Sequence, residues 1–375
     1  MPDSKALIVR TRLADLSPRA ALGVLLALLM LIGIGLALPP TSEPGGSPSG
    51  GDAALYRQVA ARVASGQNYY QAAAAEHRAS GYPLKPFTAV RPPLLAELGA
   101  LFGPSGADLL LRLLADAAAV GTAMRLAPQL RPPFREIAIL LSAAAAGAFV
   151  QAGMWVWHEM WAGLLCTLAL ACRTEHRWRL SVALGLAAAL MRELAFPFLL
   201  VMTGTAWTSG ARREARAWTA AAALAIVLLV AHMAAVASIA LPGDVTSPGW
   251  LVFGGWRFDL ALARQSLMIN LPPPVVAVAT PLALLGWCAW PGAYALRTAA
   301  LLGLWLAAFL VVGRADNSYW GFLLAPLLPV GLALAPAALR DLAEAAGLRS
   351  PRRMAAGARQ GVPASDPSRP EHVHR

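Results

Sequence analysis

The acidic residue Asp52 is the first side chain in this sequence whose type and position suggest chemistry. It lies in a Gly-Gly-Asp-Ala-Ala-Leu-Tyr stretch (residues 50–56), shortly after an apolar run of membrane-spanning length at residues 20–38. A carboxylate placed there can act as a general base that takes a proton from an attacking hydroxyl. The alternative is structural, since Asp at a helix start accepts backbone N–H bonds and suits the helix dipole. The local sequence leaves both interpretations open.

The residues after Asp52 have the spacing of an amphipathic helix over 52–63. One face carries the less polar side chains and the other faces carry the charged and amide ones. The less polar face consists of Tyr56, Val59, Ala60 and Val63. We therefore expect a short helix that presents Asp52 at its first turn.

Two pairs of neighbouring charged residues interrupt apolar sequence further along the chain. His158 and Glu159 stand among three tryptophans at the start of one apolar run, and Arg192 and Glu193 divide another. Ionisable groups at membrane depth cost several kcal/mol unless they are paired, so both pairs are candidate site residues. A helix break at that depth is tolerated mainly where it lines a cavity. The structural alternatives are an aromatic belt with polar tips at 155–161 and an ion pair between helices at Arg192.

Other polar groups have more ordinary explanations. Asp108, Arg112 and Asp116 share a helix face at a spacing of four residues, and we interpret Arg112 and Asp116 as a structural pair. Another polar group stands at the start of the last apolar run and consists of Asp316, Asn317, Tyr319 and Trp320. These residues could line a site, but an aromatic belt and a turn explain them equally well.

Composition places the chain among integral membrane proteins. It is 58% hydrophobic and 14% charged, with a mean hydropathy of +0.56, and several apolar runs approach the roughly 20 residues that span a bilayer. The net charge of +11 does not indicate nucleic-acid binding, because the basic residues flank the apolar runs as they do in cytoplasmic loops. The three cysteines form no disulfide or zinc pattern.

The apolar runs predict an all-α membrane protein of about ten transmembrane helices. The run at 178–209 is too long for one crossing, since about 32 residues of helix reach roughly 48 Å. Splitting it at Arg192–Glu193 places both termini in the cytoplasm, which puts most Lys and Arg residues on that side. The predicted spans are 20–38, 106–126, 134–151, 153–172, 178–192, 194–209, 216–240, 273–290, 294–313 and 319–338.

This topology predicts one polytopic domain over 1–340 and a polar, disordered cytoplasmic tail over 341–375. Residues 39–104 form a long extracytoplasmic loop with amphipathic helices. The cytoplasmic loops are short, and the sequence contains no Gly-rich phosphate loop and no Asp-x-Asp pair. We therefore expect any activated substrate to be carried by a lipid.

These features together resemble the GT-C superfamily, multi-span glycosyltransferases that use polyprenyl-phosphate sugars, and within it a mannosyltransferase-like, uncharacterised bacterial branch. The resemblance covers roughly residues 20–340 as architecture and about 40 residues as motifs. The motifs are the acidic start of the first far-side loop, the Pro-rich stretch 82–95 containing Arg91, the span that begins at His158–Glu159, and Arg192–Glu193 before a second short helix. The family often has two acidic residues in its first motif, whereas Asp52 stands alone here.

The resemblance implies an inverting transferase on the outer face of the bacterial cytoplasmic (inner) membrane. A monosaccharide would pass from a polyprenyl-phosphate donor to a hydroxyl of a lipid-linked or cell-envelope glycan, without a cofactor and with metal dependence open. Asp52 would be the catalytic base. Substrate would be bound by Tyr56, Arg91, His158, Glu159, Arg192 and Glu193, with Arg192 facing the cavity and holding the donor phosphate. The partners would be membrane lipid, the lipid-linked donor and the glycan acceptor, with no nucleic acid.

Two other classes explain part of the sequence. A transporter or lipid flippase accounts for ten spans and intramembrane charges, but it predicts an internal repeat that the sequence does not show. A non-enzymatic membrane scaffold makes every charge cluster structural. Convergence of Asp52, His158–Glu159 and Arg192 on one far-side cavity would favour the enzyme.

Overall fold

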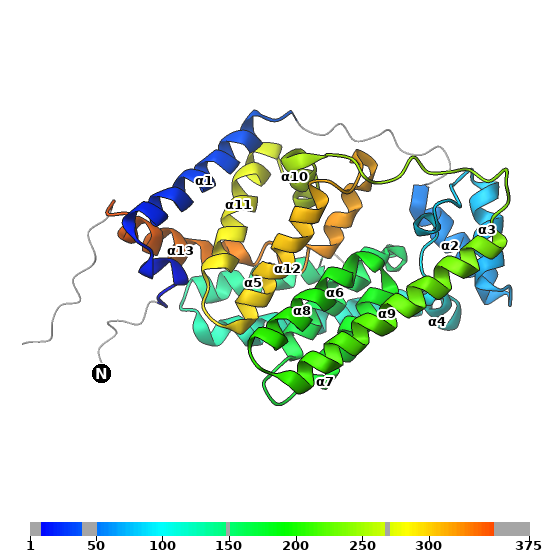
Figure 1. The fold of residues 1–375 in the computed structure, drawn as a ribbon, viewed down its shortest axis with the longest axis horizontal. Coiled ribbons are helices and arrows are strands. Elements are labelled where there is room, and N and C mark those ends of the chain that lie inside the picture. Colours follow the sequence, from blue (N-terminus) through cyan, green and yellow to red (C-terminus); the bar gives the residue numbers. More distant parts are fainter. Residues whose placement is uncertain (1–8, 40–50, 148–150, 267–270, 349–375) are drawn as a thin grey trace, which may run out of the picture.

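Helices are the main regular structure in the described part of the chain. The computed structural model describes residues 9–39, 51–147, 151–266 and 271–348, and these ranges contain helices and two isolated β-bridges but no strand. The predicted all-α class is confirmed. Figure 1 shows the N-terminal helix (Pro18–Ala37) and the last helix (Gly331–Ala345) at one side, and the two helices of residues 51–79 at the other.

Two of the described helices are long and apolar enough to cross a membrane. They are α1 (Pro18–Ala37) and α9 (Arg212–Ile239), with 20 and 28 residues. Four further apolar helices are shorter: α6 (His158–Cys172), α7 (Arg179–Met191), α11 (Pro273–Ala289) and α12 (Ala293–Phe309). The ten-span topology stays a prediction. The tail beyond residue 348 lies outside the described residues.

The helix predicted over 52–63 is present as α2 (Gly51–Ala64). It buries Leu55, Val59 and Ala60 and packs against α4 (Leu94–Leu126), with α3 (Tyr69–Ala79) beside it. The apolar face that the periodicity identified is thus the packing face. Because that face is fixed on α4, the first turn of α2 is held in one orientation, and this turn carries Asp52.

A break inside α4 lies just before the predicted span 106–126. Gly103 has a non-helical backbone (φ 68°, ψ 169°) and Pro104 follows it, so the helix bends there. The part after the bend agrees with the predicted span 106–126. The next helix is α5 (Phe134–Gly147).

The predicted division of 178–209 is observed. Helix α7 ends at Met191, a 3₁₀ turn covers Glu193–Ala195, and α8 (Phe196–Thr208) begins directly after it. Arg192 itself is extended (φ −153°, ψ 122°). The two charged residues therefore lie at a true break between helices.

The predicted last span 319–338 is wrong. Those residues divide between a 3₁₀ segment, η7 (Ala315–Leu323), and α13 (Gly331–Ala345), with turns between them. Pro326 and Pro329 lie in the turns, where each lacks the N–H that an α-helix needs. Helix α10 (Gly255–Ser266) packs against η7.

Helices α11 and α13 approach so closely that only glycine fits between them. A Cβ added to Gly286 would stand 2.0 Å from the carbonyl oxygen of Gly331. This contact joins the C-terminal helices into one layer, against which α1 also packs.

Candidate functional site

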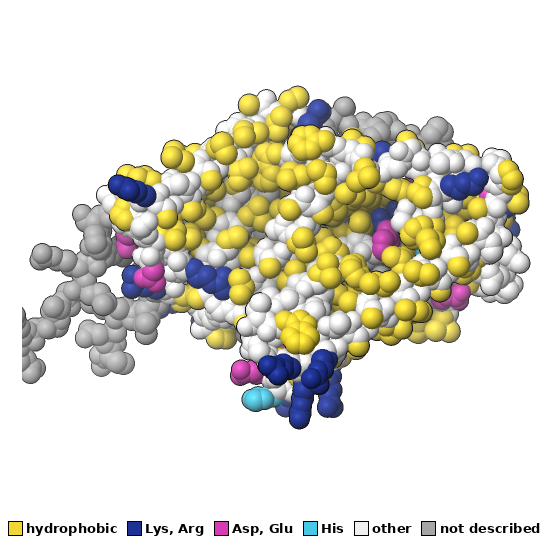
Figure 2. Space-filling model, in the orientation of Figure 1, with side chains coloured by type: hydrophobic (Ala, Val, Ile, Leu, Met, Phe, Trp, Pro, Cys, Tyr) yellow, Lys and Arg dark blue, Asp and Glu magenta, His cyan; other side chains and the backbone are white. Residues whose placement is uncertain are grey.

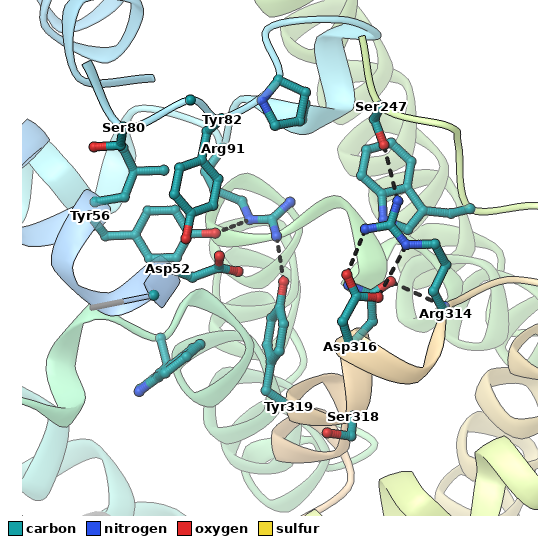
Figure 3. A pocket seen from close by; sticks show the side chains of 18 of the residues that line it. Asp52, Tyr56, Ser80, Tyr82, Arg91, Ser247, Arg314, Asp316, Ser318 and Tyr319 are labelled. Atoms are coloured by element: carbon teal, nitrogen blue, oxygen red, sulfur yellow. Dashed lines mark hydrogen bonds and ion pairs between the residues drawn. The ribbon is translucent and has the colours of Figure 1, made fainter. Parts of the chain in front are cut away.

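A cavity of about 670 Å³ opens where the N-terminal helices meet the C-terminal segments. Its walls come from the first two turns of α2, the loop 80–91, the loop 247–250 and η7 with the residue before it. Figure 3 shows side chains from these separate segments turned toward one another. Of the predicted site residues, Asp52, Tyr56 and Arg91 line this cavity.

Asp52 presents its carboxylate to the cavity without a protein partner (Figure 3). It is the second residue of α2, and no residue within the described ranges forms a hydrogen bond or an ion pair with it. The helix-capping interpretation requires its oxygens to accept backbone N–H bonds, and none of the described backbone groups donates to them. The carboxylate is therefore available to an incoming hydroxyl.

Arg91 faces the same cavity and is held only by neutral groups. Its Nε donates to the Tyr56 hydroxyl (3.0 Å), one terminal nitrogen donates to the Tyr319 hydroxyl (2.9 Å), and the other donates to the Thr88 carbonyl (3.3 Å). Burial raises the pKa of Tyr56 and of Tyr319, so both phenols are neutral at physiological pH. No described carboxylate lies within ion-pair distance of Arg91, so its guanidinium forms no salt bridge in the described part of the chain.

The opposite wall carries a neutralised pair. Arg314 donates two hydrogen bonds to the Asp316 carboxylate (3.1 and 2.6 Å) and one to the Ser247 hydroxyl (3.3 Å). Its guanidinium also lies 6.0 Å from the centre of the Trp250 ring. The charge of Arg314 is thus balanced by Asp316, in contrast to that of Arg91.

The remaining predicted site residues adjoin the cavity lining without being part of it, and all of them except Glu193 are buried. The Arg192 Nε donates to Glu159 at 2.6 Å, and a terminal nitrogen of Arg192 donates to Glu193. The Arg192 and Glu159 side chains are 1% and 0% exposed. The His158 ring packs edge-on against Tyr56 at 5.0 Å.

The expectation that Arg192 faces the cavity is therefore wrong. The ion pair with Glu159 and Glu193, which was the structural alternative, is what the structure contains. The reason is local: the extended backbone at Arg192 turns its side chain toward α6, where Glu159 stands in the first turn. The guanidinium also lies 5.7 Å from the Trp320 ring, next to the cavity residue Tyr319.

Asp108 positions the segment that leads into α6. Its two carboxylate oxygens accept the backbone N–H groups of Gly153 (2.8 Å) and Trp155 (3.1 Å). This contact orients the turn that precedes Trp157, which lines the cavity. The predicted pair of Arg112 with Asp116 is wrong, because no ion pair joins these two residues.

The sequence analysis did not identify Arg314, Ser247 or Trp250 as site residues, although all three line the cavity. Arg314 and Asp316 are two positions apart, and that spacing could have indicated a local ion pair. Ser247 and Trp250 lie in a loop without any motif, so only the fold could bring them to the site.

No metal cluster is evident in the described part of the chain, since no three His, Cys, Asp or Glu side chains gather there. Comparisons of the chain with protein-family models, curated proteins and solved structures found no match. The GT-C resemblance therefore stays a prediction that depends on short motifs.

Proposed function

We propose that this protein is a membrane glycosyltransferase that moves a monosaccharide from a polyprenyl-phosphate donor to a hydroxyl of a lipid-linked or cell-envelope glycan. The observation that supports this most is that one cavity contains both an acidic and a basic side chain, neither of which forms a salt bridge within the described residues. Asp52 is a carboxylate without a described partner, and Arg91 is a guanidinium without a carboxylate. Both open into the same space, and neither forms an ion pair with the other.

Each group suits one half of an inverting transfer. The Asp52 carboxylate accepts the proton of the acceptor hydroxyl as that oxygen attacks the anomeric carbon. The bond from that carbon to the donor phosphate oxygen breaks, and the electron pair leaves with the phosphate. Attack opposite the leaving group inverts the centre through an oxocarbenium-like state.

Arg91 is the cation best placed to stabilise the departing phosphate. It is not engaged in a salt bridge with any described carboxylate, and its partners Tyr56 and Tyr319 hold the guanidinium in position before substrate arrives. In this proposal Arg91 binds the donor phosphate, which the sequence analysis had expected Arg192 to do. Arg192, Glu159, Glu193 and His158 act in this proposal as support beneath the site.

Exposed apolar surface supports a lipid environment for the reaction. Leu26 on α1 is 66% exposed, Val227 on α9 62% and Leu101 on α4 74%. Figure 2 shows apolar side chains over most of the visible face, and basic side chains gathered at its lower edge, over the ends of α7 and α9. Large exposed apolar surfaces of this kind mark contact with membrane or with another protein. A lipid-borne donor reaches such a protein from within the bilayer.

The test is sugar transfer by membranes containing Asp52→Asn. With radiolabelled polyprenyl-phosphate sugars as donors, wild-type membranes should form a labelled glycolipid or polymer that membranes without the protein do not form. Asp52→Asn should lose about 10²-fold or more of that rate. The exposed residue Asp116 provides the control, because Asp116→Asn removes a carboxylate that does not line the cavity. A well-folded Asp52→Asn protein that retains more than about a tenth of the wild-type rate would exclude the general-base role.

The same experiment separates the transporter alternative. A flippase moves label across the membrane without forming a new glycosidic bond. Label that changes sides but stays on the donor would therefore contradict the transferase proposal.

A further inference from the structure

A second cavity, of about 860 Å³, lies at the other end of the same helices. Helix α4 begins near Arg91 at the first cavity, and its last turn lines the second. Helix α6 likewise runs from the first cavity, next to Trp157, to the second, which its last residues line. Helices α9 and α12 run the opposite way, from the second cavity toward the loops of the first. With 28 residues, α9 separates the two ends by roughly 42 Å.

The charge of the second cavity is strongly positive. Its lining includes five arginines, at positions 125, 173, 212, 213 and 297, against the two carboxylates Glu175 and Glu214. The first cavity, by comparison, is lined by two arginines and two aspartates. The second cavity therefore has an excess of three positive charges, whereas the first has none.

Arg297 is the decisive residue in this cavity. It is 5% exposed, and its Nε donates to the Thr205 hydroxyl at 3.2 Å. Its two terminal nitrogens donate to no acceptor in the described chain, and no carboxylate pairs with it. Glu214, the buried carboxylate of this cavity, already accepts two hydrogen bonds from Arg173 (3.0 and 2.7 Å). A buried cation without a counter-charge is costly, and an anion in the cavity would supply the missing partner.

Three helix N-termini add to the positive potential. Helices α7, α9 and α12 all begin at the second cavity, which is lined by Trp178, Ala211 and Gly292 immediately before their first residues. None of the three has a side-chain cap. Free N–H groups and aligned dipoles at such ends attract anions, phosphate above all.

We infer that the second cavity binds a phosphate group, with Arg297 at its base and Arg212 and Arg213 at its rim. A guanidinium presents a planar pair of donors that matches two phosphate oxygens. The phosphate belongs either to an anionic lipid headgroup or to a soluble phosphate compound. This inference does not depend on the transferase proposal, because it uses different residues at the opposite end of the helices.

The experiment is calorimetric titration of the full-length protein in an uncharged detergent. One arm uses inorganic phosphate, and the other uses short-chain phosphatidylglycerol, with short-chain phosphatidylcholine as its reference. Binding of inorganic phosphate identifies a soluble ligand class, whereas binding of phosphatidylglycerol alone identifies a lipid headgroup. We expect Arg297→Gln to weaken the binding about tenfold or more, because it removes a charge-assisted contact.

Two controls assign the signal to this cavity. Arg216→Gln removes an exposed arginine on α9 that does not line the cavity, and it should bind as the wild type does. Arg91→Gln alters the first cavity and should also leave the binding in place. Signal lost in Arg91→Gln but kept in Arg297→Gln would overturn the inference.

A rim variant keeps the test decisive if Arg297→Gln does not fold. The side chains of Arg212 and Arg213 are exposed and make no hydrogen bond or ion pair within the described chain, so replacing both residues by Gln should leave the fold intact. This double variant should bind the same probe several-fold more weakly. Unchanged affinity in the double variant, or no binding of either probe to the wild type, would refute the phosphate site.

Discussion

The buried pair of Arg192 with Glu159 makes a quantitative prediction about stability. Glu159 is fully buried; one of its oxygens accepts the 2.6 Å hydrogen bond from Arg192, and the other has no partner in the described chain. Replacing Arg192 by Met keeps much of the side-chain volume but leaves this carboxylate alone. Breaking a buried pair in this way costs about 3–5 kcal/mol of unfolding free energy. Glu193 contributes less to that cost, because its side chain is 20% exposed and water can reach it.

The assay is reversible unfolding of purified protein in detergent, together with donor kinetics of the folded fraction. Arg192→Met should be destabilised by the amount above, while its donor KM stays within about twofold of the wild type if Arg192 does not touch substrate. Adding Glu159→Gln to Arg192→Met should recover much of the loss, since the stranded charge is removed. Arg216→Met, at an exposed position, should change stability by about 0.5 kcal/mol or less. The reasoning is refuted if Arg192→Met retains wild-type stability to within about 1 kcal/mol and its donor KM rises about tenfold or more.

Three further predictions concern other parts of the fold. Hydrogen bonds from Arg78 lower the pKa of Asp244 to about 2, so this link between α3 and the loop after α9 stabilises the fold above an unfolded pKa of about 3.9 and is lost as pH falls through about 2. Asp244→Asn should therefore melt below the wild type at neutral pH, and a difference that persists unchanged at about pH 2 would contradict this. Burial raises the pKa of Asp259 on α10 to about 8, which makes wild-type stability fall as pH rises from about 3.9 to about 8. The stability of Asp259→Asn relative to the wild type should increase as pH rises across that window and stay constant above it. A pH-independent difference in melting temperature would show that the charge is not responsible. Gly286→Ala should lose about 1–3 kcal/mol or more, because its Cβ meets the Gly331 carbonyl, while Gly303→Ala on α12 points into open space and should be neutral or stabilising. Equal melting temperatures for the two alanine variants would count against the close approach of α11 and α13.

Local patterns predicted the elements better than the contacts between them. The periodicity after Asp52 identified both α2 and its buried face, because that face is decided by side chains within one helix. Charges in an apolar run identified the break at Arg192, since a continuous helix there would place both charges in hydrocarbon. The last span was predicted wrongly because its hydropathy outweighed the two prolines that interrupt it.

The site depended on long-range packing that the sequence does not encode in any single segment. An ion pair at Arg192 was only the structural alternative to the predicted cavity-facing position. Neighbouring residues point in different directions, and only the position of Glu159 decides which way Arg192 turns. The pairing of Arg314 with Asp316 is local and could be anticipated. Its hydrogen bond to Ser247 spans 67 positions, and no motif signals it.

The long sequence separation across the first cavity has a consequence for how the protein is made. Arg91 and Tyr319, which share a hydrogen bond, are 228 positions apart. Chains are synthesised from the N-terminus, so Asp52 and Arg91 leave the ribosome long before η7 exists. During that interval the Arg91 guanidinium lacks its Tyr319 partner and the cavity lacks a wall. A nascent chain that stops short of residue 314 therefore contains both groups proposed for catalysis but lacks the wall of the cavity that Arg314 and η7 provide.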